Sequence, residues 1–344
     1  MKKRRKTFEP APTISVIMPV RDGALHISES VNSIINQSYG DWELIIVDDG
    51  SSDSTPIITS SFKRKDNRIK VIRTDKQGAV AAANLAIAKS RGKWIARLDA
   101  DDIAHPDRLE KQLAFTEQNG ADVIGSKAEI LSETQVKPGF QAYFDWANSL
   151  LTHEQMTDEF LSESPFIHSS IFGKREVFLK HPYQLEEGPE DYELWLRMLR
   201  EGIKFAKIDE TLVCWRYNQQ GESRCFTTDT KIFAKVKLQH LLKTHLENKQ
   251  RVLVQGAGHQ GKMWLRLLLE KQVNVIGMLD VAQKRLGKKI EGVTVYHLDQ
   301  IGELDFDFVI SAVGQKGPNT KRVEVRQQLK DAELKELRDF VLVC

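Results

Sequence analysis

Short apolar runs alternate with segments of helical periodicity between residue 14 and about residue 125. The runs with the length and β-branched content of strands are 14–18, 42–47, 69–73, 93–98 and 122–125. Between them, apolar residues from Leu25 to Ile35 line one helical face, Gly78 opens an alanine-rich helix, and a third helix follows Pro106 and ends at Gly120. This alternation predicts an α/β domain with a mostly parallel sheet, flanked by helices on right-handed crossovers.

The pattern changes twice further along the chain. Residues 140–227 are mixed and more aromatic, which indicates an α+β lid over the active edge of the sheet. Residues 228–249 read as a charged linker helix, and strand-like runs at 251–255, 273–279, 307–313 and 339–343 follow. The predicted organisation is a basic tail at 1–11, a domain at 12–227 with halves 12–125 and 126–227, a linker at 228–249, and a small Rossmann-like domain at 250–344.

The length of 344 residues predicts two domains. With 41% hydrophobic and 28% charged residues and a net charge of +2, the composition is that of a globular protein without a global field for nucleic acid. No apolar run approaches the roughly 18 residues of a membrane span, and no signal peptide is recognisable, so we expect a cytoplasmic protein. Five basic residues from Lys2 to Lys6 leave two readings open, a solvated tail or a peripheral contact with anionic lipid at the inner face of the membrane.

The three cysteines are odd in number and scattered along the chain. They are Cys214, Cys225 and Cys344. This spacing fits neither a disulfide framework nor a thiolate metal site, so we expect packing residues or surface thiols.

Acidic residues follow two of the predicted strands. Asp99, Asp101 and Asp102 come directly after the run 93–98, and Asp48 and Asp49 end the run 42–47. Carboxylates packed this closely repel one another unless a cation lies between them, and Mg²⁺ or Mn²⁺ prefers oxygen ligands. Since ligands of open α/β sheets bind beyond the carboxyl ends of the strands, we expect both groups to converge on a metal and a diphosphate, although a solvated turn with a helix-capping aspartate remains an alternative.

A third acidic residue lies at the start of a helix in the aromatic region. Leu194, Trp195, Met198 and Leu199 form an apolar helical stripe that Gly202 ends, which places Asp191 in or before the first turn. There the helix dipole favours the ionised carboxylate. By position alone, Asp191 is more typical of a helix cap than of a catalytic group.

The start of the C-terminal region fits the dinucleotide-binding fingerprint. A strand leads into Gly256, Gly258 and Gly261 in the spacing Gly-x-Gly-x-x-Gly, and Asp280 ends the next strand 19 positions after the last glycine. These residues suit a diphosphate and a ribose. A nucleotide, a nucleotide-sugar or NAD is one reading, and a structural or docking role is the other.

Taken together, these patches resemble the family 2 glycosyltransferases, which are inverting enzymes with a nucleotide-diphospho-sugar transferase fold. The resemblance covers about residues 12–225 and rests on ordered motifs at 14–23, 47–55, 78–84, 95–108, 165–168, 190–197 and 215–216. It implies a sugar transfer from a nucleotide-diphospho-sugar to a glycan or lipid-linked glycan, in surface polysaccharide, lipopolysaccharide or glycoprotein glycan synthesis. The C-terminal region resembles the small nucleotide-binding domain of some sugar acyltransferases.

The resemblance also implies roles for individual residues. It places Asp101 on Mn²⁺ or Mg²⁺ with Asp99 assisting, and Asp191 at the position of the catalytic base. The residues that it places at the nucleotide-sugar are Pro19, Arg21, Asp48, Asp49, Gly78 and Asp99. Those that it places at the acceptor or the donor sugar are Glu190, His168 and Trp195.

One departure from the family pattern leaves room for other functions. Many relatives carry a metal-binding histidine shortly after the motif at 215–216, where this chain has Asn218. A non-catalytic nucleotide-sugar-binding scaffold is therefore one alternative. An NAD-dependent oxidoreductase acting through the C-terminal domain is the other, although no Tyr-x-x-x-Lys pair follows the fingerprint.

Overall fold

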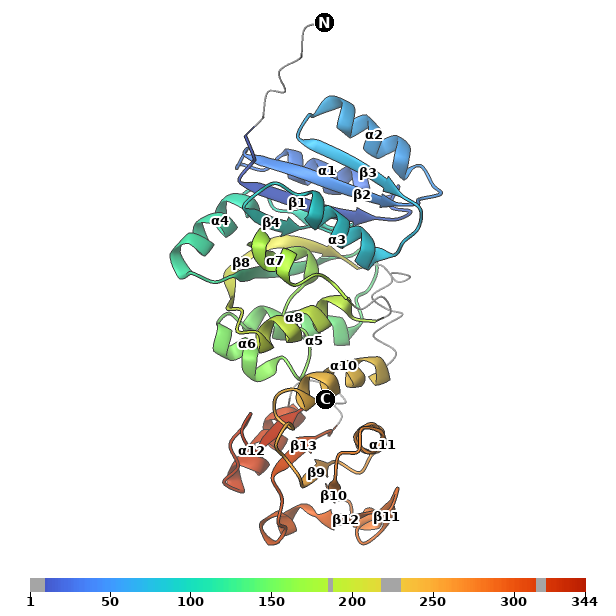
Figure 1. Cartoon of the computed structure of the whole chain (residues 1–344), viewed down its shortest axis with the longest axis vertical. Helices are drawn as coiled ribbons and strands as arrows, with labels where there is room; N and C mark the ends of the chain where they lie inside the picture. Colours follow the sequence, from blue (N-terminus) through green and yellow to red (C-terminus); the bar gives the residue numbers. More distant parts are fainter. Residues whose placement is uncertain (1–9, 185–187, 218–229, 314–319) are drawn as a thin grey trace, which may run out of the picture.

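The computed structural model describes residues 10–184, 188–217, 230–313 and 320–344. Two α/β units are stacked along the longest axis of the molecule, with helix α10 (Thr230–Leu242) between them (Figure 1). Across these described ranges, no helix is both long and apolar enough to cross a membrane. The basic run from Lys2 to Lys6, Asn218 and Cys225 lie outside the described residues.

The first unit is built on an eight-stranded sheet in the order β3-β2-β1-β4-β7-β6-β8-β5. The pairs β2–β3, β1–β2, β1–β4 and β6–β8 are parallel, whereas β7 runs antiparallel to β4 and β6, and β5 antiparallel to β8. The sheet is thus mixed and mostly parallel, as the sequence predicted. Its strands are β1 (Ile14–Val20), β2 (Trp42–Asp49), β3 (Ile69–Thr74), β4 (Trp94–Arg97), β5 (Ile103–Ala104), β6 (Val123–Leu131), β7 (Phe172–Lys174) and β8 (Phe205–Arg216).

Helices cover both faces of this sheet. Ile27, Val31 and Ile34 recur on one face of α1 and are completely buried, each stabilising the fold by roughly 1.5–3 kcal/mol. Helix α4 ends where Gly120 adopts the left-handed conformation at φ 68°, as the sequence predicted. The helices are α1 (Ile27–Ile35), α2 (Thr55–Lys65), α3 (Ala79–Lys89), α4 (Arg108–Asn119), α5 (Pro138–Ser149), α6 (His153–Glu159), α7 (Arg175–Lys180) and α8 (Glu190–Arg200), with a 3-10 turn η1 (His168–Ser170).

The expectation of an α+β lid over the sheet edge at 140–227 is wrong in one respect. Strands β7 and β8 from this region are part of the main sheet, and β8 pairs with β6 over most of its length. The strand periodicity of β8 is hidden because only part of it is buried, with Asp209 and Glu210 exposed in its middle. The region therefore contributes both sheet and covering helices α5, α6 and α8 (Figure 1).

The second unit has a six-stranded sheet in the order β11-β12-β10-β9-β13-β14, parallel except for the edge strand β11. Gly261 in its first helix leaves no room for a side chain, because a Cβ there would lie 1.5 Å from the carbonyl oxygen of Gly256. The elements are β9 (Val252–Gln255), α11 (His259–Glu270), β10 (Val275–Asp280), η2 (Gln283–Arg285), β11 (Lys289–Ile290), β12 (Val293–His297), η3 (Leu298–Glu303), β13 (Phe308–Ser311), α12 (Thr320–Asp331) and β14 (Phe340–Leu342).

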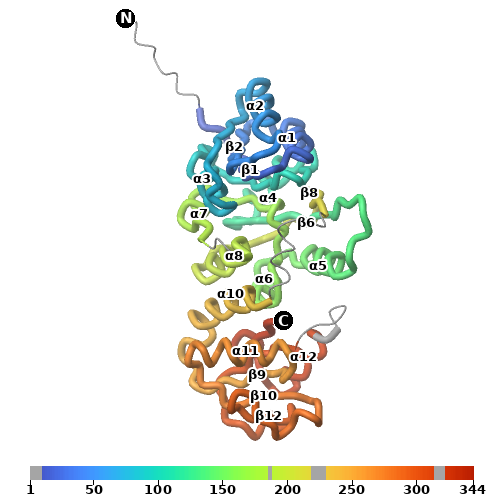
Figure 2. The backbone as a smooth tube through the Cα atoms, turned by 90° about the vertical axis from the view of Figure 1, so that its right-hand side faces the viewer, coloured from blue at the N-terminus to red at the C-terminus, as the bar shows by residue number. Residues whose placement is uncertain are grey.

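The two units are held together by buried polar contacts as well as apolar packing. The ammonium group of Lys237 on α10 donates to the carbonyl oxygens of Ser162 at 2.8 Å and Val343 at 3.0 Å. Arg326 on α12 pairs with Glu159 at 2.8 Å. Figure 2 shows α10 lying between α8 and α11 in the rotated view as well. The predicted domain boundaries stay predictions, although the two sheets fall on either side of this helix.

Candidate functional site

Three parallel strands end side by side at the edge that the sequence indicated. Strands β2, β1 and β4 are neighbours, and the register pairs Val20 with Asp48. Arg21 follows β1 directly, Asp48 and Asp49 end β2, and Asp99 lies two residues beyond β4. The parallel register therefore gathers the acidic strand ends that are far apart in sequence.

Asp49 organises the loop that leads into α3. Its carboxylate accepts hydrogen bonds from the Thr74 hydroxyl at 2.8 Å and from the backbone N–H groups of Gln77 and Gly78, both at 2.7 Å. Burial opposes ionisation, but these donors and the charge of Arg21 together hold the pKa of Asp49 below its ordinary value. Gly78 has φ 97°, a conformation that glycine adopts without strain. Asp49 is therefore a positioning residue for this loop.

The neighbouring Asp48 is buried but incompletely bonded. Its Oδ1 accepts the backbone N–H of Ser51 at 2.9 Å, whereas its Oδ2 is buried and has no hydrogen-bond partner among the described residues. Pro19 is half-buried near the end of β1, and the side chain of Arg21 is 42% exposed. An unsatisfied carboxylate oxygen at the end of β2 and an exposed cation directly after the neighbouring β1 suit a ligand with both donor and anionic groups.

The turn after β4 holds three carboxylates with different partners. Arg97, itself buried, pairs with Asp99 at 2.8 Å, and although burial opposes ionisation, this guanidinium lowers the pKa of Asp99. Asp102 is buried, accepts from the Ser169 hydroxyl and from the backbone N–H of Arg216, and has a pKa well above its ordinary value. The rise comes from burial and from the charges of Asp101 and Asp99.

These donors fit a hard divalent cation. The repulsion that raises the pKa of Asp102 is the charge imbalance that such a cation relieves, and all the side-chain donors are oxygens. The positive charge of Arg97 already balances the negative charge of Asp99. Asp101 is therefore the principal candidate ligand of the cation. Asp102 is buried and bonded to Ser169, so it is neither part of a solvated turn nor the cap of α4, whose N-cap is Asp107.

Arg216 joins the end of β8 to this turn. Its Nε donates to the carbonyl oxygen of Asp101 at 2.8 Å, and its backbone N–H donates to Asp102, also at 2.8 Å. The motif at 215–216 is therefore in contact with the acidic turn more than 100 residues earlier.

Asp191 is the second residue of α8 and lies in the field of the same acidic turn. Burial raises its pKa to about 7, the charges of Glu190 and Asp99 add to the rise, and the N–H of Tyr192 and the charge of Arg97 oppose it. The expectation that the helix terminus favours the ionised form is wrong in its net direction, because burial and neighbouring carboxylates outweigh the dipole. The residue preceding α8 is Pro189, so Asp191 is not its N-cap, although its Oδ1 accepts the N–H of Tyr192 at 2.7 Å.

His168 and Tyr183 lie near the charged side chains of Arg97 and Glu190. The Nε2 of His168 lies 2.7 Å from the Tyr183 hydroxyl, and its Nδ1 lies 4.0 Å from Glu190. Burial and the charge of Arg97 lower the pKa of His168 well below its ordinary value, so the imidazole is neutral at pH 7. Glu190, a predicted sugar contact, is half-buried beside it.

Trp195 has a different place from the one its motif implied. Its side chain is completely buried and packs edge to face against Phe166 and His168. An indole with no exposed surface offers nothing to a sugar, so the predicted sugar contact is corrected to support beneath His168. The apolar helical stripe already indicated this burial.

Sequence reasoning did not assign Ser169 and Tyr183 to the site, and it did not identify Arg97 as the partner of Asp99. Arg97 had one signal, a cation inside the otherwise apolar run 94–98. Ser169 lies within an identified patch without a distinguishing feature, and Tyr183 has no local signal because its contact with His168 depends on tertiary packing.

Tertiary folding also brings a cysteine beside two other polar side chains. One ligand atom each of His105, Glu129 and Cys214 lies within 4.8 Å of the other two, an arrangement able to hold a metal ion that the cysteine spacing did not predict. Burial and the hydrogen bond to Glu129 raise the pKa of the Cys214 thiol to about 12. Because the thiolate is the metal-binding form, the metal prediction stays with Asp101 and Asp99.

In the C-terminal unit, the carboxylate of Asp280 is already engaged. It accepts from the backbone N–H groups of Ala257 at 2.7 Å and Ala282 at 2.8 Å, and it pairs with Arg285 at 2.8 Å. Gly256, at φ 97°, and Gly258 form the turn into α11 as the fingerprint predicts. The carboxylate that would accept a hydrogen bond from a ribose hydroxyl already has hydrogen-bond partners within the protein. This arrangement gives the NAD interpretation no support.

Comparison with known proteins agrees with this geometry. The glycosyl transferase family 2 model matches residues 15–181, and a model described as C2185-like, N-terminal, matches residues 248–338. An uncharacterised glycosyltransferase of Haemophilus influenzae is 30% identical over 66% of this chain and 72% of its own length. The O-antigen biosynthesis glycosyltransferase WbnJ of Escherichia coli is 31% identical over 61% of this chain and 82% of its own length.

Solved structures share the fold at low sequence identity. TarS of S. aureus in complex with UDP-GlcNAc has 16% identity and a TM-score of 0.55 over 75% of this chain and 80% of that one. The mannosyltransferase PcManGT from Pyrobaculum calidifontis, in complex with GDP-Man and Mn²⁺, has 16% identity and a TM-score of 0.52 over 68% of this chain and 64% of that one. With its ordered acidic strand ends and these relatives, the chain belongs to the family 2 glycosyltransferases.

Proposed function

We propose that this glycosyltransferase is a metal-dependent inverting enzyme in which Asp191 is the general base. The observation that carries the proposal is the Asp191 carboxyl, whose pKa is raised to about 7 and which interacts electrostatically with Arg97 and Asp99 beyond β4. A base is most effective when its pKa lies near the working pH. Asp191 combines that property with a place beside the proposed donor site.

The proposed reaction is a single displacement. The ionised Asp191 accepts the proton of an acceptor hydroxyl while that oxygen attacks the anomeric carbon from the face opposite the nucleoside diphosphate. The bond from the anomeric carbon to the diphosphate breaks as the new glycosidic bond forms, so the anomeric configuration inverts. Neutral His168 and half-buried Glu190 are placed to orient the sugar or acceptor through hydrogen bonds.

Asp101, with Asp99, is the proposed holder of a divalent cation. When bound, Mn²⁺ or Mg²⁺ neutralises the negative charge that develops on the departing diphosphate. Arg97 keeps Asp99 ionised, and Asp102 fixes the turn through Ser169 and Arg216. The Mn²⁺ in the mannosyltransferase structure supports this assignment by analogy of fold.

The nucleoside is proposed to lie over the ends of β1 and β2. The exposed Arg21 supplies a cation, Pro19 borders the pocket, and the free Oδ2 of Asp48 supplies an acceptor for a base or ribose donor. Asp49 acts indirectly by holding the loop at Gly78. The named functions of the relatives support a role in surface polysaccharide or lipopolysaccharide assembly, with a glycan or lipid-linked glycan as acceptor.

The test is a nucleotide-sugar panel, screened by thermal stabilisation of the full chain with and without Mn²⁺. We expect one donor to raise the melting temperature only with the metal, and Asp101→Ala to abolish that rise. Asp107→Asn is the matched control, because Asp107 lies nearby at the start of α4 and pairs with Lys111 outside the acidic turn. Full metal-dependent binding by a folded Asp101→Ala variant would refute the metal assignment, and sugar transfer with retained configuration would refute the mechanism.

A further inference from the structure

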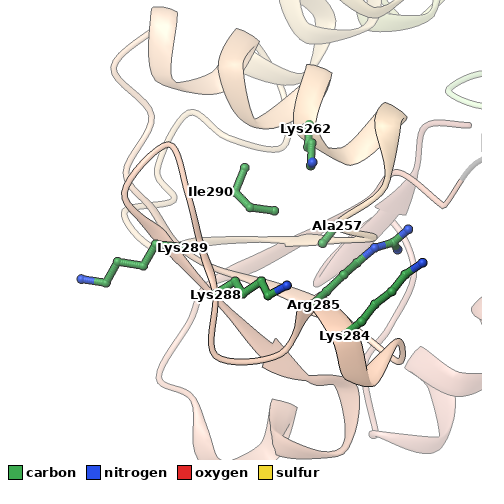
Figure 3. A pocket seen from close by; sticks show the side chains of 7 residues that line it. All are labelled: Ala257, Lys262, Lys284, Arg285, Lys288, Lys289 and Ile290. Atoms are coloured by element: carbon green, nitrogen blue, oxygen red, sulfur yellow. The ribbon is translucent and has the colours of Figure 1, made fainter.

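A cavity of about 340 Å³ lies in the C-terminal unit beside the glycine-containing turn. Ala257 and Ile290 form part of its wall, and the other lining side chains are all cations: Lys262, Lys284, Arg285, Lys288 and Lys289. Figure 3 shows Lys262 reaching down from α11 toward Ala257, while Lys284 and Arg285 run side by side below it. The side chain of Lys288 lies along the cavity, and that of Lys289 points away from it (Figure 3).

These charges are not balanced locally. Arg285 pairs with Asp280, but in the described parts of the chain none of the four lysines that line the cavity forms an ion pair. Four cations within six positions, 284 to 289, repel one another, and a concave basic surface of this kind concentrates small anions. This cavity is therefore electrostatically opposite to the acidic strand ends of the first unit.

The surrounding backbone favours an anion as well. Helix α11 has twelve residues and begins next to Ala257, so the positive end of its dipole lies at the cavity. The carboxylate of Asp280 is turned inward onto the Ala257 N–H and Arg285. The ligand chemistry that remains available is thus phosphate recognition by cations, without a carboxylate for a ribose.

We propose that this cavity is a second ligand site, which binds a diphosphate group independently of the donor site. Lys262, Lys284 and Lys288 contact the phosphate oxygens, and Arg285 couples the bound anion to Asp280 and hence to the turn at Ala257. A diphosphate carries enough negative charge to offset several of these cations. The site goes beyond the proposed sugar transfer, because it shares no residue with that reaction.

The test is calorimetric titration of the full chain with inorganic pyrophosphate in EDTA, which keeps a metal-dependent donor site from contributing. We expect binding that weakens as salt is raised, and about a tenfold loss of affinity in Lys284→Gln/Lys288→Gln, since two charge-assisted contacts are removed. Lys289→Gln is the control, because it removes one positive charge from the same segment but from a side chain that points away (Figure 3). Its affinity should stay within about twofold of the original.

Two further measurements make the result decisive. Melting temperatures without ligand confirm that the exposed lysine variants are folded, and a parallel titration with UDP shows whether a nucleoside adds affinity to the diphosphate. Equal affinity for pyrophosphate and UDP supports recognition of phosphates alone, and tighter UDP binding that is lost in the double variant supports a nucleotide in the same cavity. Absence of pyrophosphate binding up to about 10 mM, or unchanged affinity in the double variant, would overturn the proposal, while leaving the sugar-transfer assignment intact.

Discussion

Replacing Asp191 by asparagine should remove activity and stabilise the fold at the same time. The substitution keeps the side-chain size and an oxygen that accepts the N–H of Tyr192, but removes the ionisable group. If Asp191 is the general base, its loss lowers the rate of sugar transfer by about 10²–10⁴-fold. If it were only a residue of the first helical turn, the rate would not change.

The stability effect follows from the pKa of Asp191, which is raised from 3.8 to about 7. Between these values the unfolded chain loses the proton and the folded chain keeps it, so the carboxyl destabilises the fold above pH 3.8, and fully above pH 7. The folded and unfolded pKa values of Asp191 differ by about three, and each pKa unit corresponds to about 1.36 kcal/mol. The carboxyl group therefore lowers the unfolding free energy by roughly 4 kcal/mol at pH 8 and by roughly 2 kcal/mol at pH 5. The asparagine variant should recover up to these amounts of unfolding free energy.

The assay is urea denaturation of both proteins at pH 5 and pH 8, combined with release of nucleoside diphosphate from the donor identified by the panel. Asp299→Asn is the control, because the Asp299 side chain is 87% exposed on the C-terminal unit. If Asp191 only stabilised its helix, the substitution would instead lower the unfolding free energy by about 0.3–1 kcal/mol. An active variant, or one less stable at pH 8 than the original protein, would refute the reasoning. In the active enzyme, the rate should rise with pH through about 7 as the base ionises.

Three other substitutions test the ion pair at the acidic turn, the loop before α3 and the contact between the two units. Arg97→Gln leaves Asp99 without its partner, so we expect a loss of roughly 3 kcal/mol of unfolding free energy and a shift of the pH–rate profile to higher pH, measured by denaturation and initial rates. Asp49→Ala removes three hydrogen bonds from the loop before α3. Because folding lowers the pKa of Asp49, the carboxylate stabilises the fold above its unfolded pKa, and this stabilisation is lost as the pH falls through its folded pKa. The unfolding free energies of the variant and the original protein should therefore converge in acid. Arg326→Gln breaks the pair with Glu159 between the two units and should leave sugar transfer unchanged while increasing proteolysis near α10. Unchanged proteolysis would show that this ion pair does not hold the units together and that the Lys237 hydrogen bonds and apolar packing suffice.

Most elements of the first unit were predictable because their signals are local. The runs that became β1 to β4 are apolar over four to eight residues, and Gly120 stops α4 where the sequence predicts. Helix α2 was missed because its apolar residues are few and only Thr55 and Thr59 are buried. Strand β8 was missed because exposed acids interrupt its pattern.

In the candidate site too, some features were predictable from local sequence and others depended on tertiary packing. The shared edge for Asp48, Asp49 and Asp99 could be predicted from sequence, because carboxylates directly after apolar runs are a local pattern and parallel strands place their ends together. Their roles toward a ligand or a metal, like that of Asp101, stay predictions. The placement of Trp195 could not be decided from its motif, since burial depends on what packs against α8. The role of Asp280 also could not be decided from sequence, because the fingerprint specifies the residue but not the Arg285 that pairs with it.

By itself, the sequence determined the α/β class, the positions of β1 to β4 along the chain and the acidic strand ends, since these depend on the chemistry of neighbouring residues. Only the tertiary structure decided which charges share an environment. It buried Asp191 near Glu190 and Asp99, which raises the pKa of the proposed base more than Arg97 lowers it, and it gathered five cations around one cavity in the C-terminal unit. The physical reason is that desolvation and Coulomb interactions depend on distance and burial in space, and neither quantity is written in the local sequence.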